Sequence, residues 1–368
     1  MKRLLLLAGE ESGVLYAEQI RRAVLRAWPD AEIRGYGDYG FAVSDLAVMG
    51  ILAVIRKIFY FMRVMRTMKR AIDEWRPDVV CTVDYPGMNL KLAAHAKSRG
   101  IRAVHVVCPQ VWAWKQGRIP KIEASLDRLC CFFPFEPALF RPGFAEFVGH
   151  PLAEGGRVER VERVDLKGVE KEGGKLLAVL PGSRMGEIRH HMATLLESVA
   201  ELRRAIPGLR VSIPAANERA LRAIKEEIGR SGCGDGVEVR LGGARGLLAR
   251  ADAAVVASGT ATLEAALAGC PTVLVYKVDP VFAFVARRVI KGVRHIGLAN
   301  VVAEKAGVAC PMPELLQEDF SADAVTAHLR PLLTDPAANA AARRDLAAVT
   351  ALLGSGDDSI ELIVRNLV

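Results

Sequence analysis

The chain has 368 residues, about half of them apolar, with 50 basic and 42 acidic side chains. This length is too great for one typical domain and suits two, and the apolar content allows sizeable buried cores. The formal net charge of +8 fits nucleic acid, anionic lipid or phosphorylated substrates without choosing among them. Seven cysteines lack C-x-x-C spacing and indicate buried, reduced thiols rather than a disulfide framework.

Short apolar runs alternate with helical patterns along the whole chain. The first run, residues 4–8, leads directly into Glu10 and Glu11, and therefore predicts a buried strand rather than a signal peptide. Residues 14–28 follow with helical periodicity, and this βαβ rhythm predicts mostly parallel sheets. No stretch is long and apolar enough to span a bilayer. Further strands are predicted at 79–83, 103–107, 176–180, 211–213, 237–240, 253–256 and 272–276.

A charged segment with five glycines, residues 154–174, separates the two series of predicted strands. We therefore expect an α/β chain with a first domain over 1–155 and a second over 156–354. Each half has the pattern of a Rossmann-like, doubly wound parallel sheet, and two such facing units leave a cleft in which ligands bind. The helical C-terminal segment, residues 355–368, is expected to pack on the first domain.

Two glycine-containing turns in the second half follow predicted strands and open helices. Pro181-Gly182-Ser183-Arg184 combines backbone N–H groups at a helix start with a permanent cation, a geometry that suits phosphate. An ordinary turn with a surface arginine is an equally good interpretation. Neither turn matches the Walker or dinucleotide-binding signatures.

The second of these turns runs from Ser258 through Gly259 and Thr260 to Thr262, with Glu264 one helical turn beyond Thr260. The hydroxyl groups suit phosphate, and the carboxylate suits ribose hydroxyls. The alternative is a capped core helix with a surface glutamate. Two such turns in one half make a nucleotide site the better interpretation.

Gly9-Glu10-Glu11-Ser12-Gly13 follows the first strand and carries the small residues that allow close approach of a ligand. Its two carboxylates disfavour phosphate. They suit sugar hydroxyls or proton transfer instead.

Residues 51–70 form a basic, apolar-rich segment without a single acidic side chain. Such a segment is typical of binding to a membrane surface, and a core-packed helix with a solvated basic flank is the alternative. No nucleic-acid-binding motif accompanies it, so nucleic acid is not expected as a partner. The predicted membrane-facing residues are Arg56, Lys57, Phe59, Phe61, Arg63, Arg66 and Arg70.

The histidines are scattered along the chain. His190 and His191 are interpreted as solvent-facing helix residues, and His150 lies at the predicted domain edge. No group of residues has metal-ligand spacing, so no bound metal is predicted.

Taken together and in order, eight short motifs resemble the lipid A disaccharide synthase family over nearly the whole chain. Single motifs are weak, but the ordered series at these spacings is highly specific. The motifs run from Gly9 to Gly13, Asp84 to Asn89, Pro109 to Trp114, Phe133 to Glu136, Phe147 to Pro151, Leu180 to Arg184, Ala257 to Glu264 and Pro313 to Gln317.

The resemblance implies a GT-B fold and an inverting glycosyl transfer without metal or other cofactor. The donor would be UDP-2,3-diacylglucosamine and the acceptor would be 2,3-diacylglucosamine 1-phosphate. The reaction would join the two sugars by a β-1,6 bond and release UDP. The enzyme would attach peripherally to the cytoplasmic face of the inner membrane, where these acylated lipids reside. The oligomeric state stays open.

The resemblance and the turns give a set of expected site residues. The catalytic candidates are Glu10, Glu11, Asp84 and Arg184. The expected substrate-binding and UDP-binding residues are Ser12, Gly13, Asn89, Gly182, Ser183, Arg184, Ser258, Gly259, Thr260, Thr262, Glu264 and Asn300.

This chain departs from the family pattern at two positions. Val14 stands where members usually carry Asp, and Gly87 stands where many carry an Asp that has been proposed to act in catalysis. The general base is then expected among Glu10, Glu11 and Asp84, and Glu10 is favoured because it aligns with the acidic residue of the family's first loop. A non-catalytic paralogue and another GT-B enzyme of UDP-sugars, such as an epimerase, are the alternatives.

Overall fold

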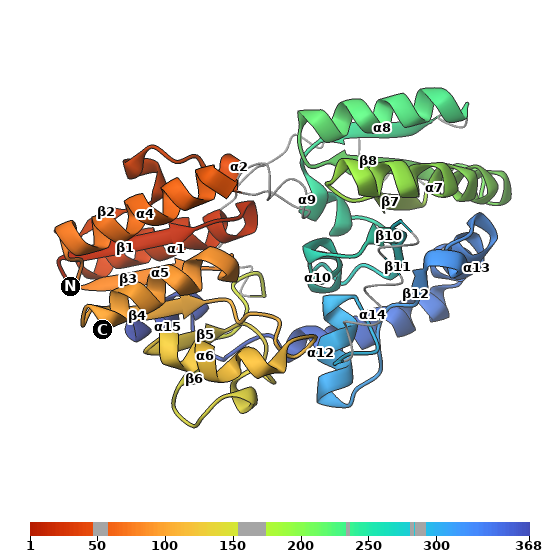
Figure 1. Cartoon of the computed structure of the whole chain (residues 1–368). Helices are drawn as coiled ribbons and strands as arrows, with labels where there is room; N and C mark the ends of the chain where they lie inside the picture. Colours follow the sequence, from red (N-terminus) through yellow and green to blue (C-terminus); the bar gives the residue numbers. More distant parts are fainter. Residues whose placement is uncertain (47–57, 154–173, 233–235, 280–282, 284–291) are drawn as a thin grey trace. The chain divides into compact units, whose positions relative to one another are not determined.

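The computed structural model describes residues 1–46, 58–153, 174–232, 236–279, 283 and 292–368, which form two compact units. The first unit comprises Met1–Glu154 and Leu353–Val368, and the second comprises Gly155–Leu352. The chain therefore leaves the first unit once and returns to it for its last helix, so that both termini belong to the same unit (Figure 1).

The first unit is a parallel sheet with helices on both faces (Figure 1). The strand order is β2-β1-β3-β4-β5-β6, and every neighbouring pair is parallel. The helices α1 (Glu11–Ala27) and α15 (Ser359–Asn366) cover one face, while α4 (Ile58–Trp75), α5 (Pro86–Ser98) and α6 (Ile119–Ser125) cover the other. The strands are β1 (Arg3–Ala8), β2 (Glu32–Arg34), β3 (Val79–Val83), β4 (Arg102–Val106), β5 (Arg128–Cys131) and β6 (Ala145–Phe147).

The strand β1 shows why these strands appear in the sequence as unbroken apolar runs. Leu4 and Leu6 belong to the core beneath α1 and α15, whereas Leu5 and Leu7 belong to the core on the opposite face. A strand covered on both faces needs no polar alternation. The last helix completes the first of these cores, because Ile363 is fully buried in the same cluster as Leu4.

The second unit repeats the same design with the order β12-β11-β10-β7-β8-β9, again with all pairs parallel. The helices α7 (Met185–Ala205), α8 (Glu218–Ser231) and α13 (Ala322–Thr334) enclose one core. The helices α10 (Thr260–Leu267), α12 (Leu298–Ala306) and α14 (Pro336–Ala351) pack against one another. The strands are β7 (Leu176–Leu180), β8 (Arg210–Ala215), β9 (Val237–Leu241), β10 (Ala253–Ala257), β11 (Thr272–Tyr276) and β12 (Glu314–Leu316), and α9 (Ala244–Leu248) follows β9.

Two doubly wound parallel sheets confirm the predicted fold class, and the strands predicted at 79–83, 176–180 and 272–276 are correct to the residue. The short strands β2, β5, β6 and β12 were not predicted, since three or four residues are too few to show a pattern. Among the helices that the structure describes, none is long and apolar enough to cross a bilayer.

Candidate functional site

The first loop and the Asp84–Asn89 motif meet at the carboxyl ends of β1 and β3, which are neighbours in the sheet. The ring of Tyr85 packs where Gly9 has no side chain, because a Cβ atom on Gly9 would lie 2.4 Å from Tyr85 Cδ1. A Cβ atom on Gly13 would lie 3.6 Å from Asp84 Cβ. Residues of two motifs that are far apart in the sequence thus lie together in one site. Tyr85 belongs to this site, although the sequence did not indicate it as a site residue.

Asn89 holds this site together from inside. Its amide nitrogen donates to the carbonyl oxygens of Leu7 at 3.2 Å, Val83 at 3.2 Å and Asp84 at 2.8 Å. Its side-chain oxygen accepts a 2.7 Å hydrogen bond from the hydroxyl of buried Tyr36, a residue that no sequence pattern indicated. Asn89 is fully buried with these partners and positions the backbone of the turn, and its contact with substrate stays a prediction.

The turn held by Asn89 is strained. Asp84 and Tyr85 have φ angles of 52° and 51°, in the left-handed region that residues with side chains seldom adopt. Such outliers persist only where surrounding contacts enforce them, and they concentrate at functional sites. The Asp84 carboxylate accepts a 2.7 Å bond from the Tyr85 N–H, which fixes its direction.

Asp84 and Glu10 differ in their surroundings. Asp84 is half-buried, and this burial raises its pKa above the ordinary value of 3.8 against the opposing effect of the Tyr85 N–H. Glu10 is exposed at the N-cap of α1. The pKa of Tyr85 is raised, mainly because Tyr85 is partly buried and also because the negative charge of Glu10 lies nearby. The side chains of Glu11 and Ser12 lie outside what the structure describes. Gly87 is exposed with no atom within 4 Å of where a Cβ would stand.

Aromatic side chains flank the carboxyl ends of β4 and β5. Trp112 meets Phe135 edge-on with 5.8 Å between ring centroids, and Phe133 stacks on Phe135 at 5.8 Å. Trp112 and Phe133 are buried, whereas Trp114 is 37% exposed. Trp112 is therefore part of the core, and Trp114 has surface available for a ligand.

In the second unit, the turn before α7 binds its own chain. The carboxylate of Glu187 accepts the N–H groups of Ser183 and Arg184 at 3.2 and 3.3 Å, and it pairs with Arg184 Nη1 at 2.7 Å. Gly182 is required there, because its φ is 109° and a Cβ would lie 2.5 Å from Glu187 Oε2. The predicted phosphate-binding N–H groups are thus occupied by an internal carboxylate. Sequence reasoning missed this capping box, for which Glu187 at the third helical position is the signal.

Among the residues that the structure describes, no side chain binds the N–H groups of the turn before α10. Its N-cap residue is Gly259, and no side chain caps the helix. Gly259 has a φ of 147°, and open space lies where its Cβ would be. Gly259 and Thr260 are exposed, so the positive end of this helix is available to an anion.

Other predicted residues of this turn have internal partners. Thr262 is buried and donates to the Gly259 carbonyl at 2.8 Å, so it stabilises the turn and cannot reach a ligand. Ser258 donates to the Ile296 carbonyl at 3.2 Å. Glu264 is partly exposed and pairs with Arg245 Nε at 3.1 Å.

Two further polar side chains serve the scaffold of the second unit. Asn300 is fully buried and donates to the Met312 carbonyl and to Glu314, which gives it a structural role, and its contact with substrate stays a prediction. The prediction that His191 faces solvent is wrong. His191 is fully buried and joins the Pro181 carbonyl, at 2.7 Å, to the backbone N–H of Lys277, at 3.0 Å.

The described part of the basic segment is the helix α4. Its buried face consists of Val64, Met68, Ala71 and Ile72, with Phe61 packed partly against the same core. Phe59 is 81% exposed and Met62 51% exposed. Arg63 and Arg66 are exposed, and Arg70 pairs with Glu74 at 2.6 Å. Arg56 and Lys57 lie outside the described residues.

The fold is shared with several solved structures. The "S. aureus MnaA-UDP co-structure" matches with a TM-score of 0.65 and 12% identity, covering 100% of this chain and 98% of that one. UDP-GlcNAc 2-epimerase from Neisseria meningitidis bound to UDP-GlcNAc gives 0.64 at 12% identity, covering 100% and 99%. The calicheamicin glycosyltransferase CalG4 gives 0.58 at 16%, covering 100% and 98%. These likenesses define the class as the two-domain GT-B fold.

The sequence comparisons name the family within that class. The family model for lipid-A-disaccharide synthetase matches residues 4–356. Lipid-A-disaccharide synthases from Chromohalobacter salexigens and Geobacter sulfurreducens are each 36% identical over 96% of this chain and 94% of their own length. The synthase from Neisseria meningitidis is 35% identical over 98% and 95%. The chain therefore belongs to the lipid-A-disaccharide synthase family, glycosyltransferases of lipid A biosynthesis.

Replacing Asp84 by Asn is expected to raise the free energy of unfolding at neutral pH by roughly 0.5–2 kcal/mol. The substitution removes a negative charge that burial destabilises. The side-chain oxygen of Asn can still accept the hydrogen bond from the Tyr85 N–H, and Asn tolerates a positive φ angle. Since the folded state binds the Asp84 proton more tightly than the unfolded chain, the gain is absent below the ordinary pKa of 3.8. The gain then grows as the pH rises to the folded pKa.

Denaturation in urea, followed by tryptophan fluorescence at acid and neutral pH, measures this effect. All four tryptophans, Trp28, Trp75, Trp112 and Trp114, lie in the first unit, so the signal reports that unit alone. A lower stability of Asp84→Asn at neutral pH would contradict the raised pKa.

Proposed function

We propose that the chain transfers a 2,3-diacylglucosaminyl group from UDP to the 6-hydroxyl of 2,3-diacylglucosamine 1-phosphate and releases UDP. Membership of the lipid-A-disaccharide synthase family supports the two acylated sugars. The UDP of the MnaA co-structure and the UDP-GlcNAc bound to the Neisseria epimerase support a UDP-sugar donor on this fold. The observation that carries the chemistry is the strained, half-buried Asp84 at the carboxyl end of β3.

In this proposal Asp84 is the general base. It removes the proton from the acceptor 6-hydroxyl, whose oxygen forms the new bond to the donor C1 as the bond from C1 to UDP breaks, with inversion. Burial raises the pKa of Asp84 above its ordinary value, which makes this carboxylate a stronger base than a solvent-exposed aspartate. Glu10 stands at the N-cap of α1, and in this proposal it binds an acceptor hydroxyl.

The donor is assigned to the second unit. The uncapped turn at Gly259 and Thr260 accepts the diphosphate on its N–H groups, and Glu264 binds the ribose hydroxyls. Arg184 is about half exposed and keeps N–H groups beyond the one bonded to Glu187. Donors fixed in place stabilise the charge that develops on departing UDP, so this scheme assigns no step to a metal ion.

The absence of an aspartate at Gly87 fits this assignment. The space around Gly87 is open, and its helical backbone accepts any side chain, so an aspartate there would occupy solvent beside the same turn. In this branch, Asp84 supplies the carboxylate that other members of the family place further along the same motif.

Asp84→Asn is expected to lower kcat by roughly 10²–10⁴-fold with little change in KM, because the base acts only in the transition state. Glu10→Gln is expected to raise KM for the acceptor more than it lowers kcat. The assay is mass spectrometry of disaccharide phosphate formed in detergent with EDTA present.

Gly87→Asp in the Asp84→Asn background provides the matched control. It is expected to restore part of the lost rate, since it returns a carboxylate to the same turn. A kcat that survives Asp84→Asn but is lost in Glu10→Gln would make Glu10 the base. No product from wild-type protein that still binds UDP would overturn the proposed reaction.

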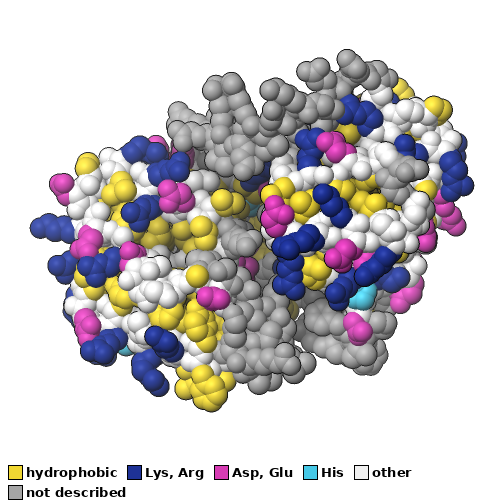
Figure 2. Space-filling view, turned by 90° about the horizontal axis from the view of Figure 1, so that it is seen from above, with side chains coloured by type: hydrophobic (Ala, Val, Ile, Leu, Met, Phe, Trp, Pro, Cys, Tyr) yellow, Lys and Arg dark blue, Asp and Glu magenta, His cyan; other side chains and the backbone are white. Residues whose placement is uncertain are grey.

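We also propose that the enzyme attaches peripherally to the cytoplasmic face of the inner membrane through the start of α4. Ile58, Phe59 and Met62 are exposed there, and Val14 and Leu15 are exposed at the start of α1. Both helices begin at the carboxyl edge of the sheet, which is also the edge that carries Asp84. Figure 2 shows basic and hydrophobic side chains together on the face of the first unit that carries α4. Apolar burial and attraction to anionic lipid both favour such attachment.

Phe59→Ser is expected to lower the partition constant onto anionic vesicles about tenfold, because a buried phenylalanine contributes roughly 1.5–3 kcal/mol. Vesicle co-sedimentation measures the change. Leu241→Ser is the control, since Leu241 is 47% exposed on β9 of the other unit. If wild type and Phe59→Ser bind the vesicles equally well, the proposal that α4 contacts the membrane is wrong.

A further inference from the structure

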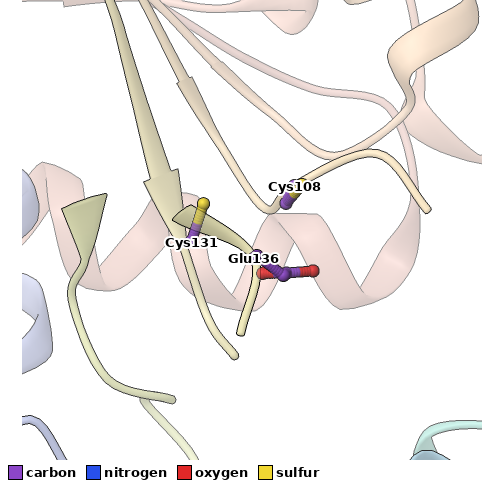
Figure 3. A group of neighbouring side chains, drawn as sticks. All are labelled: Cys108, Cys131 and Glu136. Carbon is purple, nitrogen blue, oxygen red and sulfur yellow. The ribbon is translucent and has the colours of Figure 1, made fainter. Parts of the chain in front are cut away.

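Two thiols and a carboxyl group meet inside the first unit, at the ends of β4 and β5. Cys108 follows β4, Cys131 ends β5, and Glu136 lies in the turn that follows. The Sγ atoms of the cysteines and a carboxylate oxygen of Glu136 all lie within 4.8 Å of one another (Figure 3). Their exposed fractions are 3%, 0% and 1%, so the cluster is closed to solvent.

We propose that Cys108, Cys131 and Glu136 bind one structural divalent ion of the zinc class. Thiolate sulfur selects zinc and its soft neighbours over magnesium or calcium, and a carboxylate oxygen is a regular additional ligand of zinc. Sequence spacing did not indicate this site, because the fold alone brings the ends of two neighbouring strands together. The ion has no part in the glycosyl transfer proposed above.

The surroundings of Glu136 support a metal ligand. One carboxylate oxygen accepts a 3.0 Å hydrogen bond from Trp112 Nε1, and the other accepts a 3.1 Å bond from the N–H of Phe133. Metal-bound carboxylates are held by such outer hydrogen bonds, which orient them and offset their charge. Cys108 Sγ also lies 3.3 Å from the carbonyl oxygen of Pro109, which accepts its S–H, so this thiol is held in place at the end of β4.

Binding must displace protons. Metal ions of this class bind cysteine as the thiolate and glutamate as the carboxylate, so any proton on these groups must leave. A divalent ion replaces two S–H protons and the carboxyl proton, which pass to solvent, and leaves one negative charge on the cluster. The N–H groups of Trp112 and Phe133 stabilise that charge.

The ion would join two loops that carry the aromatic side chains of the first unit. Cys108 begins the loop that leads to Trp112, and Glu136 closes the turn that contains Phe133 and Phe135. Bonds to one ion fix both loops to β4 and β5. The expected consequence is a more stable first unit.

Cobalt(II) provides the test, because thiolate–cobalt bonds give a charge-transfer absorption in the near ultraviolet. The protein is refolded with cobalt, freed of excess metal by gel filtration, and is expected to retain about one ion per chain with that absorption. Every protein carries Cys233→Ala and Cys310→Ala, since exposed Cys310 lies 3.3 Å from His295 Nε2 and offers a competing pair of ligands.

Cys108→Ser and Cys131→Ser are each expected to lose the absorption and the bound cobalt. Cys130→Ser is the matched control, because Cys130 is equally buried in the neighbouring position of β5 but faces the opposite core. Glu136→Gln is expected to keep the absorption and release the ion at least about tenfold faster. The proposal fails if the parent protein with Cys233→Ala and Cys310→Ala binds no cobalt, if the absorption survives both serine variants, or if mass spectrometry finds a Cys108–Cys131 disulfide.

Discussion

The side chain of Asn89 is the constraint on which the first unit's site depends. Its amide group joins the last residues of β1 and β3 to the start of α5, and the hydroxyl of Tyr36 fixes which way the amide faces. These hydrogen bonds hold Asp84 and Tyr85 at positive φ angles, a conformation that would be unfavourable without them. Burial raises the pKa of the Asp84 carboxylate above its ordinary value, which is the direction that a general base requires.

The second unit shows how two similar turns acquire different roles. Both turns follow a central strand and open a helix, and both contain a glycine with a positive φ. Glu187 fills the positive end of α7 and pins Arg184 beside it, whereas the start of α10 has no side-chain cap. The Glu187 carboxylate occupies the N–H groups at the start of α7, so a phosphate cannot bind to the same groups. The open helix is the one that suits a diphosphate.

Sequence alone was sufficient for the longer strands, for the fold class and for the family, because buried parallel strands are continuous apolar runs and the motifs occur in order. It did not indicate the short strands β2, β5, β6 and β12. It was insufficient for deciding which motif residues touch a ligand. Asn89 lies in such a motif and Asn300 follows one. Their hydrogen-bond partners, Tyr36 and Met312, are brought to them only by the fold. Both asparagines are buried with these partners and stabilise the backbone around them. The Cys108–Cys131–Glu136 cluster likewise exists only once β4 and β5 are side by side.

The pH dependence of kcat/KM tests the central assignment most directly, since it reports the pKa of the base in the free enzyme. The account predicts an acid limb whose pKa lies above 3.8, kept in Glu10→Gln and absent from the residual activity of Asp84→Asn. An acid limb that disappears in Glu10→Gln and persists in Asp84→Asn would contradict it, and would place the base on the first loop.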